Sequence, residues 1–318
     1  MTRSEELGNS EHKTALQRIE TLPLIPPRPA DSHKGTFGRV LIVAGSRGMS
    51  GAAVLCGLGA LRGGAGLVQV ATPREIQPIV AGANPCYLTA ALPQDEHGRI
   101  SYQALEMIWE LARSATVVAL GPGLGQSCGL QHLVARLVSE LPRPLVVDAD
   151  GLNNLAQAGV EALAPAPAPR IITPHPGEFA RLVGATTAQV QIQREQFAAE
   201  FARRHRVIVV LKGHGTVVTD GERLYRNTTG NPGLASGGTG DVLTGLLAAL
   251  LAQRLEPFTA AQLAVFLHGR AGDLAREAKG EIGLIASDLP EFLPLAIRQI
   301  TARPVPTETP RRESCPTP

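Results

Sequence analysis

Aromatic residues, closely spaced cysteines and an excess of charge of one sign are all missing or scarce in this 318-residue chain. Aromatic side chains make up 3% of the residues, whereas alanine, glycine, leucine and valine are abundant. This balance favours helices packed closely on a parallel sheet over an all-β sandwich. The net charge is +2 and no basic block stands out. Composition therefore gives no reason to expect a nucleic acid or a membrane surface as a partner.

The four cysteines are also widely separated, and none forms a CxxC pair or lies at zinc-binding distance from a histidine. Cys56, Cys86, Cys128 and Cys315 are therefore predicted to be free thiols in a reducing compartment. No apolar run approaches the length of a membrane span. The polar N-terminus, which contains acidic residues, is unlike a secretory signal or a transit peptide. We expect a soluble, cytoplasmic protein.

The length suits one large domain with tails. Residues 1–30 are polar and end in PLIPPRPA, which predicts an N-terminal extension or linker. Residues 303–318 have almost nothing to bury and are predicted to be disordered. The folded domain is expected over residues 31–302.

Short runs rich in β-branched residues recur along this domain, at residues 39–45, 66–73, 115–123, 144–151, 170–178 and 207–216. Segments with helical spacing lie between them, as at residues 51–64 and 102–114. This alternation predicts an α/β fold with a central, mostly parallel sheet flanked by helices. Residues 216–227 predict a hairpin that turns at Asp220 and Gly221.

Five of the six predicted strands end on glycine, proline or a polar cluster. In open α/β sheets, ligands bind outside the carboxyl ends of the strands. The sequence therefore predicts a binding site along that one edge of the sheet.

The stretch GGTGD at residues 237–241 is followed by an apolar helical stripe, Val242, Leu243, Leu246, Leu247, Leu250 and Leu251. This pattern predicts a buried helix whose first turn lies at Gly240 and Asp241. The glycines leave the first amides of the helix unobstructed, and the helix N-terminus is the positive end of its dipole. The stretch therefore predicts a phosphate site.

Asp241 has two interpretations. An acidic residue in a first turn can simply complement the helix dipole, which is worth under about 1 kcal/mol. The cluster of Gly237, Gly238 and Gly240 instead indicates close approach of a ligand to the backbone. A carboxylate beside a phosphate is repelled unless it accepts a proton from an attacking hydroxyl. The pattern therefore favours Asp241 as a catalytic base.

GGTGD before a buried helix resembles the anion hole and catalytic base of the ribokinase-like superfamily. More specifically, six stretches in order are similar to successive motifs of the ADP- or ATP-dependent NAD(P)H-hydrate dehydratases: residues 34–73, 121–125, 146–153, 173–182, 211–216 and 230–243. The resemblance runs from about Lys34 to about Pro294. It implies a three-layer ribokinase-like fold and a dehydratase without an epimerase domain.

The resemblance implies a repair enzyme that acts on the S epimers of NADHX and NADPHX, the 6-hydroxylated hydrates of NADH and NADPH. ADP, or ATP in eukaryotic relatives, phosphorylates the hydroxyl, and loss of phosphate restores the dihydropyridine ring. Asp241 would be the base, and the backbone of Gly238, Thr239 and Gly240 would hold the transferring phosphoryl group. Mg²⁺ is expected to bridge the phosphates.

The resemblance also assigns binding residues in the other stretches. It implies that nucleotide is bound through Lys212, Gly213, His214, Gly215 and Thr216, and that the hydrate is bound by Ala52, Gly123 and His175 together with Asp241. Each assignment has a plainer alternative. A lysine at a strand end is often a solvated charge, a single histidine is usually structural, and small residues such as Gly51 and Ala52 also permit close helix packing.

Glu178 separates two related functions. Many vitamin kinases of the superfamily carry Asn-x-x-Glu at this strand end, whereas this chain has His175 in place of the asparagine. The difference favours the dehydratase over a vitamin-precursor kinase and leaves the metal ligands open. Asp148, Asp150 and Asn153 end another strand and could either contact magnesium or tie the loop down.

Three further expectations rest on the resemblance. ADP is favoured over ATP because the compact form resembles bacterial members, which also suggest a homotetramer. Only about 33 residues precede Lys34, too few for an epimerase domain, so a separate epimerase is expected as a functional partner. A nucleotide-binding regulator without catalysis is a further alternative, against which the intact GGTGD stretch speaks.

Overall fold

The computed structural model describes residues 16–163 and 166–301. Its strands form a single sheet in the order β1-β10-β9-β8-β7-β6-β5-β2-β3-β4. The strands are β1 (Gln17–Arg18), β2 (Arg39–Val43), β3 (Leu67–Pro73), β4 (Leu88–Leu92), β5 (Val117–Leu120), β6 (Leu145–Val147), β7 (Arg170–Ile172), β8 (Ile208–Leu211), β9 (Val217–Thr219) and β10 (Arg223–Arg226).

The strands from β8 to β4 in this order are all parallel, whereas β9 is antiparallel to both β8 and β10. The mostly parallel sheet predicted from the sequence is therefore confirmed. The predicted hairpin is also confirmed, because β9 and β10 are joined by a turn in which Asp220 Oδ1 accepts the amides of Glu222 and Arg223. The β4 strand and the short β1 strand were not predicted.

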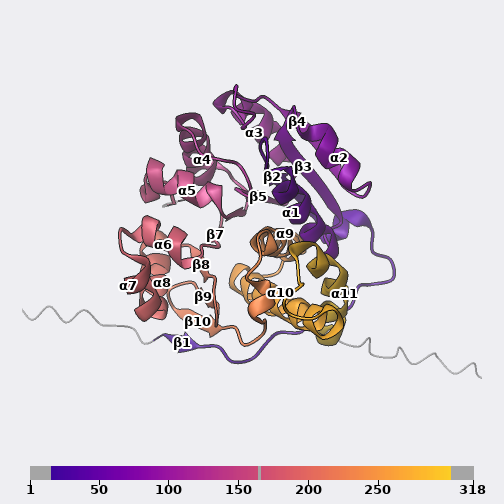
Figure 1. Ribbon diagram of the computed structural model, residues 1–318, viewed down its shortest axis with the longest axis vertical. Helices are drawn as coiled ribbons and strands as arrows, with labels where there is room; N and C mark the ends of the chain where they lie inside the picture. The colour runs from indigo at the N-terminus through magenta and orange to yellow at the C-terminus, as the bar shows by residue number, and fades with distance from the viewer. Residues whose placement is uncertain (1–15, 164–165, 302–318) are drawn as a thin grey trace, which may run out of the picture.

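Helices cover both faces of the sheet. They are α1 (Ser50–Arg62), α2 (Gln77–Ala83), α3 (Leu105–Arg113), α4 (Cys128–Glu140), α5 (Asp150–Ala158), α6 (Pro176–Val183), α7 (Thr187–Ile192), α8 (Arg194–His205), α9 (Thr239–Ala252), α10 (Pro257–Lys279) and α11 (Leu289–Ile300), with short 3-10 turns η1 (Lys34–Phe37), η2 (Tyr102–Ala104), η3 (Val160–Leu163), η4 (Pro232–Leu234) and η5 (Ala286–Asp288). Figure 1 shows α1, α9, α10 and α11 on one side of the sheet and α3 to α8 on the other.

Two hydrophobic cores lie between these layers, one on each face. Side chains alternate between the faces of a strand. Along β2, Val40 and Ile42 enter the core beneath α1 and α9, while Leu41 and Val43 enter the core beneath α3 and α4. Strands buried on both faces must be apolar at successive positions, which explains the continuous apolar runs in the sequence.

Helix α9 is the most deeply placed element near the predicted site. From Val242 to Ala252 every residue is buried, because the helix packs against the sheet, α1 and α10. Glycine permits this close packing. A Cβ on Gly59 of α1 would lie 2.3 Å from the carbonyl oxygen of Val242. The abundance of small residues is thus a requirement of the α1–α9 contact.

The described part of the segment before residue 31 runs along the domain. β1 pairs with β10, Ile25 forms a bridge with Thr301, and Gln262 Nε2 donates to the carbonyl oxygen of Thr21 at 2.7 Å. The domain boundary at residue 31 stays a prediction. Residues 303–318, for which disorder was predicted, lie outside the described residues. Of the four cysteines, Cys56, Cys86 and Cys128 are free thiols, and Cys315 lies outside the described residues.

Candidate active site

The carboxyl ends of β2, β5, β6, β7 and β8 gather the predicted site residues at one edge of the sheet, where α9 begins. Gly238 caps α9 with a left-handed backbone, φ 93°. Within the described ranges, the amides of Gly238 and Gly240 have no hydrogen-bond acceptor. A Cβ at Gly237 would meet only open space. The turn therefore presents free amides at the positive end of a helix, as an anion site requires.

Asp241 lies in the first turn of α9, directly beyond these amides. Burial raises the pKa of Asp241 to about 7, and the negative charge of Asp148 adds to this effect, whereas Lys212 opposes it. A carboxylate with a pKa near neutrality can accept a proton and is still ionised in a useful fraction of molecules at physiological pH. This environment suits a general base better than a residue that only complements the helix dipole.

Asp148 follows β6 and links three elements. Its side chain is 1% exposed, Oδ1 accepts from Lys212 Nζ at 2.7 Å, and Oδ2 accepts from Thr244 Oγ1 of α9 at 2.7 Å. Burial lowers the pKa of Lys212, but Asp148 and Glu178 raise it by more. The ammonium is therefore charged, and it lies 3.2 Å from the position that a Cβ on Gly240 would take. Asp148 thus fixes a positive charge beneath the glycine turn at residues 237–240, which we call the anion turn.

The backbone beside Asp148 is strained. Ala149 has φ 50° and ψ −122°, a conformation that residues with a side chain rarely adopt. Such strain persists only where surrounding contacts enforce it, and it concentrates at functional sites. The unusual backbone at Ala149 turns the chain sharply between Asp148 and Asp150, and the two carboxylates form hydrogen bonds with different partners.

Asp150 and Asn153 tie down the loop that follows β5. Asp150 Oδ2 accepts the amide of Gly125 at 2.9 Å, and its other oxygen accepts from Asn153 Nδ2 at 3.2 Å. Asn153 Oδ1 in turn accepts from Arg181 at 2.8 Å. Of the two roles that the sequence left open for these residues, the structure thus displays loop anchoring.

His175 and Glu178 form a reciprocal cap at the start of α6. His175 Nδ1 accepts the amides of Gly177 and Glu178 at 3.0 and 3.3 Å, and Glu178 Oε2 accepts the amide of His175 at 2.8 Å. Burial, and then Lys212 and Arg181, lower the pKa of His175. The ring is therefore neutral with its proton on Nε2, 3.3 Å from Glu178 Oε1. The ring is about half exposed and free to meet a ligand on its open face.

Ala52 and Gly123 come together although 70 residues of chain separate them. A Cβ on Gly123, which has φ 63°, would lie 2.9 Å from the Ala52 Cβ. Ser46 Oγ donates to the Gly123 carbonyl oxygen at 2.8 Å and closes the contact. A Cβ on Gly51 would meet no atom within 4 Å. Gly123 is therefore buried against Ala52, and Gly51 is the small residue of this group that faces open space.

The loop at residues 212–216 connects β8 to β9. Gly213 and Gly215 have φ values of 135° and 65°, which residues with a side chain rarely adopt. Thr216 Oγ1 donates to the Gly213 carbonyl oxygen at 2.9 Å, and the Lys212 amide donates to the Pro174 carbonyl oxygen at 2.9 Å. The second bond joins this loop to the His175 turn. His214 is exposed.

His268 of α10 is a neighbour of the site that sequence reasoning missed. Its Nε2 lies 2.8 Å from the carbonyl oxygen of Thr239, in the first turn of α9. Burial lowers the pKa of His268 to about 4, so the ring is neutral and donates to this carbonyl. His268 thereby holds the anion turn from behind. It carried no local motif, because a single histidine within a helix resembles any core residue.

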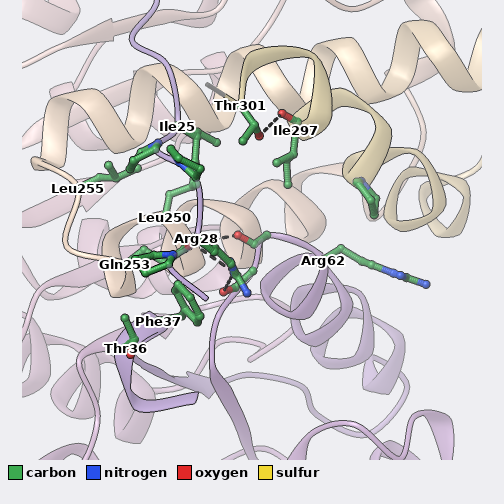
Figure 2. Close-up of a pocket in the computed structure, with 16 residues that line it drawn as sticks. Ile25, Arg28, Thr36, Phe37, Arg62, Leu250, Gln253, Leu255, Ile297 and Thr301 are labelled. Carbon is green, nitrogen blue, oxygen red and sulfur yellow. Dashed lines mark hydrogen bonds between the residues drawn. The ribbon is translucent and has the colours of Figure 1, made fainter. Parts of the chain in front are cut away.

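Two cavities lie away from this edge. One, of about 400 Å³, lies at the opposite end of α9, where Arg28 of the N-terminal segment stacks over Phe37 and donates to the Gly64 carbonyl oxygen at 2.6 Å (Figure 2). The other, of about 690 Å³, lies between α5, α6 and α8 and includes His205. Except for Arg181, which reaches Asn153, neither contains a residue of the edge described above, so neither is the candidate active site.

The comparisons with known proteins agree with this geometry. The family model for NAD(P)H-hydrate dehydratase matches residues 40–295. The chain belongs to the NAD(P)H-hydrate dehydratase family. The ADP-dependent (S)-NAD(P)H-hydrate dehydratase of Bacillus subtilis is 35% identical over 272 residues, which cover 85% of this chain and 92% of that protein.

A solved structure and a longer relative also match the chain. A solved structure of the ADP/ATP-dependent NAD(P)H-hydrate dehydratase of Bacillus subtilis, co-crystallised with ATP and Mg²⁺, matches 87% of this chain and 95% of that one, with 33% identity and a TM-score of 0.73. The predicted fold is thereby confirmed. A bifunctional NAD(P)H-hydrate repair enzyme of Moorella thermoacetica is 44% identical over 278 residues, 87% of this chain but 52% of the relative. The chain thus spans about half the length of such relatives.

In this family member, no helix among the residues that the structure describes is long and apolar enough to cross a membrane. The described residues also contain no group of three or more histidine, cysteine, aspartate or glutamate side chains arranged to hold a metal ion.

Proposed function

We propose that this chain is an ADP- or ATP-dependent dehydratase that restores NADH and NADPH from the S epimers of NADHX and NADPHX. The observation that carries the proposal is the position of Asp241, a partly buried carboxylate with a pKa of about 7, one residue beyond the free amide of Gly240. Phosphoryl transfer to an alcohol needs a general base next to an anion hole.

In the first step, Asp241 accepts the proton of the 6-hydroxyl while the hydroxyl oxygen forms a bond to the terminal phosphorus of the nucleotide. The bond from that phosphorus to the bridging oxygen breaks, and AMP leaves when the donor is ADP. The amides of Gly238 and Gly240 stabilise the charge on the transferring group, and the Lys212 ammonium beneath Gly240 adds a fixed positive charge. Thr239 keeps this turn in place through its contact with His268.

In the second step, the bond between C6 and the phosphate oxygen breaks. Phosphate is a far better leaving group than hydroxide, and the lone pair of the ring nitrogen supplies the electrons that expel it. Loss of a proton from the neighbouring ring carbon then restores the double bond of the dihydropyridine. The substrate would lie against Ala52, Gly123 and the open face of His175, which are assigned to it by the resemblance alone.

Mg²⁺ fits this proposal as a partner of the nucleotide. The Asp148 oxygens already accept bonds from Lys212 and Thr244, and Glu178 caps α6. The protein therefore offers little direct coordination, which suits an ion that keeps several waters and binds mainly to phosphate oxygens. When bound, Mg²⁺ would neutralise charge on the phosphates.

The test is incubation of the purified protein with NADH hydrate, Mg²⁺ and either ADP or ATP, while the absorbance of reduced nicotinamide is followed. We expect recovery with at least one nucleotide, with ADP favoured, and loss of turnover in Asp241→Asn with an unchanged fold. Asp220→Asn is a matched control, because it removes a carboxylate that accepts backbone amides in the β9–β10 turn, at the opposite edge of the sheet, and it should keep turnover. Full activity in Asp241→Asn would place the base elsewhere.

The remaining expectations are proposals of the same kind. The family match does not favour a vitamin-precursor kinase. We propose that an epimerase activity supplies the S epimer to this chain, that the chain assembles as a homotetramer, and that it acts in the cytoplasm. Light scattering on the purified protein would measure the mass of the assembly.

A further inference from the structure

Two arginines flank the loop at residues 212–216 from neighbouring elements. A Cβ on Gly213 would lie 2.9 Å from Nη1 of Arg194, the first residue of α8, and a Cβ on Gly215 would lie 2.7 Å from Nε of Arg226, the last residue of β10. Each guanidinium therefore packs against the side of a glycine where other residues carry a Cβ. Any side chain at either position would displace it.

The two arginines have different bonding partners. Arg194 Nη2 donates to the carbonyl oxygens of Leu211 and Lys212 at 2.9 and 3.1 Å, and Nη1 donates to Gln191 Oε1 at 2.9 Å. Arg194 is therefore committed to holding the end of β8. Arg226 is exposed, and the part of the chain that the structure describes gives its guanidinium neither a hydrogen bond nor an ion pair. Its donors remain available to a ligand.

The charge around this loop is unbalanced. Burial lowers the pKa of Arg194, and the charge of Arg226 lowers it further. Glu195, next to Arg194 in the sequence, pairs with Arg18 at 2.7 Å and so does not neutralise the two arginines. Lys212 of the same loop is held by Asp148. Two neighbouring positive charges without a carboxylate cost free energy that a bound anion would recover.

We propose that Arg226 binds a phosphate group of the nucleotide co-substrate, and that Arg194 is a positioning residue that holds the loop against it. This inference rests on the proposed function, in which residues 212–216 bind the nucleotide. The planar guanidinium presents several donors in a geometry that matches phosphate oxygens. Lys212 is paired with Asp148 beneath the anion turn, whereas Arg226 beside the loop is unpaired among the described residues and can bind a phosphate group directly.

The test is isothermal titration of ADP and of adenosine into the wild type, Arg226→Gln and Arg298→Gln. Arg298 is an exposed arginine of α11, far along the chain from the loop, and serves as the matched control. We expect Arg226→Gln to weaken ADP binding about tenfold or more, the usual loss for a charge-assisted hydrogen bond. Adenosine binding should not change, and Arg298→Gln should bind both ligands as the wild type does.

A second measurement is the salt dependence of ADP binding. The dissociation constant should rise less steeply with NaCl in Arg226→Gln than in the wild type, because one screened charge is missing. Arg226→Lys, which keeps the charge, should restore part of the affinity and the salt dependence. Circular dichroism and the melting temperature establish that each variant is folded.

The outcomes separate the two proposals. Unchanged ADP binding in Arg226→Gln, or an equal loss for adenosine, would overturn the assignment of Arg226 to phosphate while leaving the proposed function intact. A wild-type protein that binds no ADP or ATP at all would overturn the proposed function, and this inference with it.

Discussion

Lys212 and Asp148 form an ion pair across the carboxyl edge of the sheet, with 2.7 Å between Nζ and Oδ1. The pair joins the ends of β8 and β6, which flank β7. Gly240 lies over the same ammonium. The charge beneath the anion turn therefore depends on one buried contact, and the same two groups modulate the high proton affinity that burial gives Asp241.

Activity should depend on pH through Asp241. Its pKa in the folded protein is raised from 3.8 to about 7, and only the ionised form can accept the substrate proton. We expect kcat/KM to rise about tenfold per pH unit below 7 and to level off above it. The measurement is a pH profile of the hydrate reaction at saturating nucleotide. A profile that is flat between pH 5 and 8 would exclude Asp241 as the titrating base.

Removal of the Asp148 charge should move this profile. Asp148 raises the pKa of Asp241, and its loss also frees the Lys212 ammonium, which lowers that pKa. In Asp148→Asn the rising limb is expected roughly one unit lower in pH. Thr244→Val, which removes a hydrogen bond to Asp148 but no charge, should leave the limb in place. A limb that stays near pH 7 in Asp148→Asn would contradict this electrostatic account.

The cap made by His175 can be separated from its role in binding. His175→Ala removes the acceptor for two amides of α6 and should lower the free energy of unfolding by about 1 kcal/mol. His175→Asn keeps a good capping residue and should retain most of that stability. If the ring contacts the hydrate, both variants should raise KM for it. Denaturant titration and steady-state kinetics on the same preparations measure the two effects, and a normal KM in His175→Asn would leave His175 with the structural role alone.

The close contact between α1 and α9 predicts a strong position dependence for glycine replacement. A Cβ on Gly245 would lie 1.9 Å from the carbonyl oxygen of Cys56, so Gly245→Ala should lower the free energy of unfolding by about 1–3 kcal/mol. Gly82 of α2 is the matched control, because a Cβ there meets no atom within 4 Å. Gly82→Ala should raise stability by up to about 1 kcal/mol. Equal effects in urea denaturation would mean that the helices move apart freely.

Much of the fold was predictable because its signals are local. Apolar runs marked the six consecutive strands from β8 to β3 in the sheet order, and the Asp220–Gly221 turn marked the hairpin. β4 was missed because its residues, Leu88–Leu92, lie at the edge of the sheet and show no clear strand pattern. β1 consists of two residues and exists only through its pairing with β10, so no property of its own sequence could have revealed it.

The candidate site was likewise predictable only where its signals are local in the sequence. The glycine turn and Asp241 were found because a helix start, a glycine cluster and a carboxylate adjoin in the sequence. His268 and Thr244 were missed because each is an ordinary helix residue whose partner lies elsewhere in the chain. The hydrogen bond from the Gly125 amide to Asp150 could not be read from the sequence, since the same carboxylate suits a metal or a backbone amide.

The sequence by itself determined the alternation of strands and helices, the sheet edge at which the predicted site residues gather and the carboxylate at the start of α9, because short-range spacing and backbone freedom encode these features. Only the tertiary structure decided which charges meet. The pairing of Asp148 with Lys212, 64 positions apart, and the unbalanced arginines beside Gly213 and Gly215 arise from strand order. Burial among these groups raises the pKa of Asp241, and burial is a property of the packed chain.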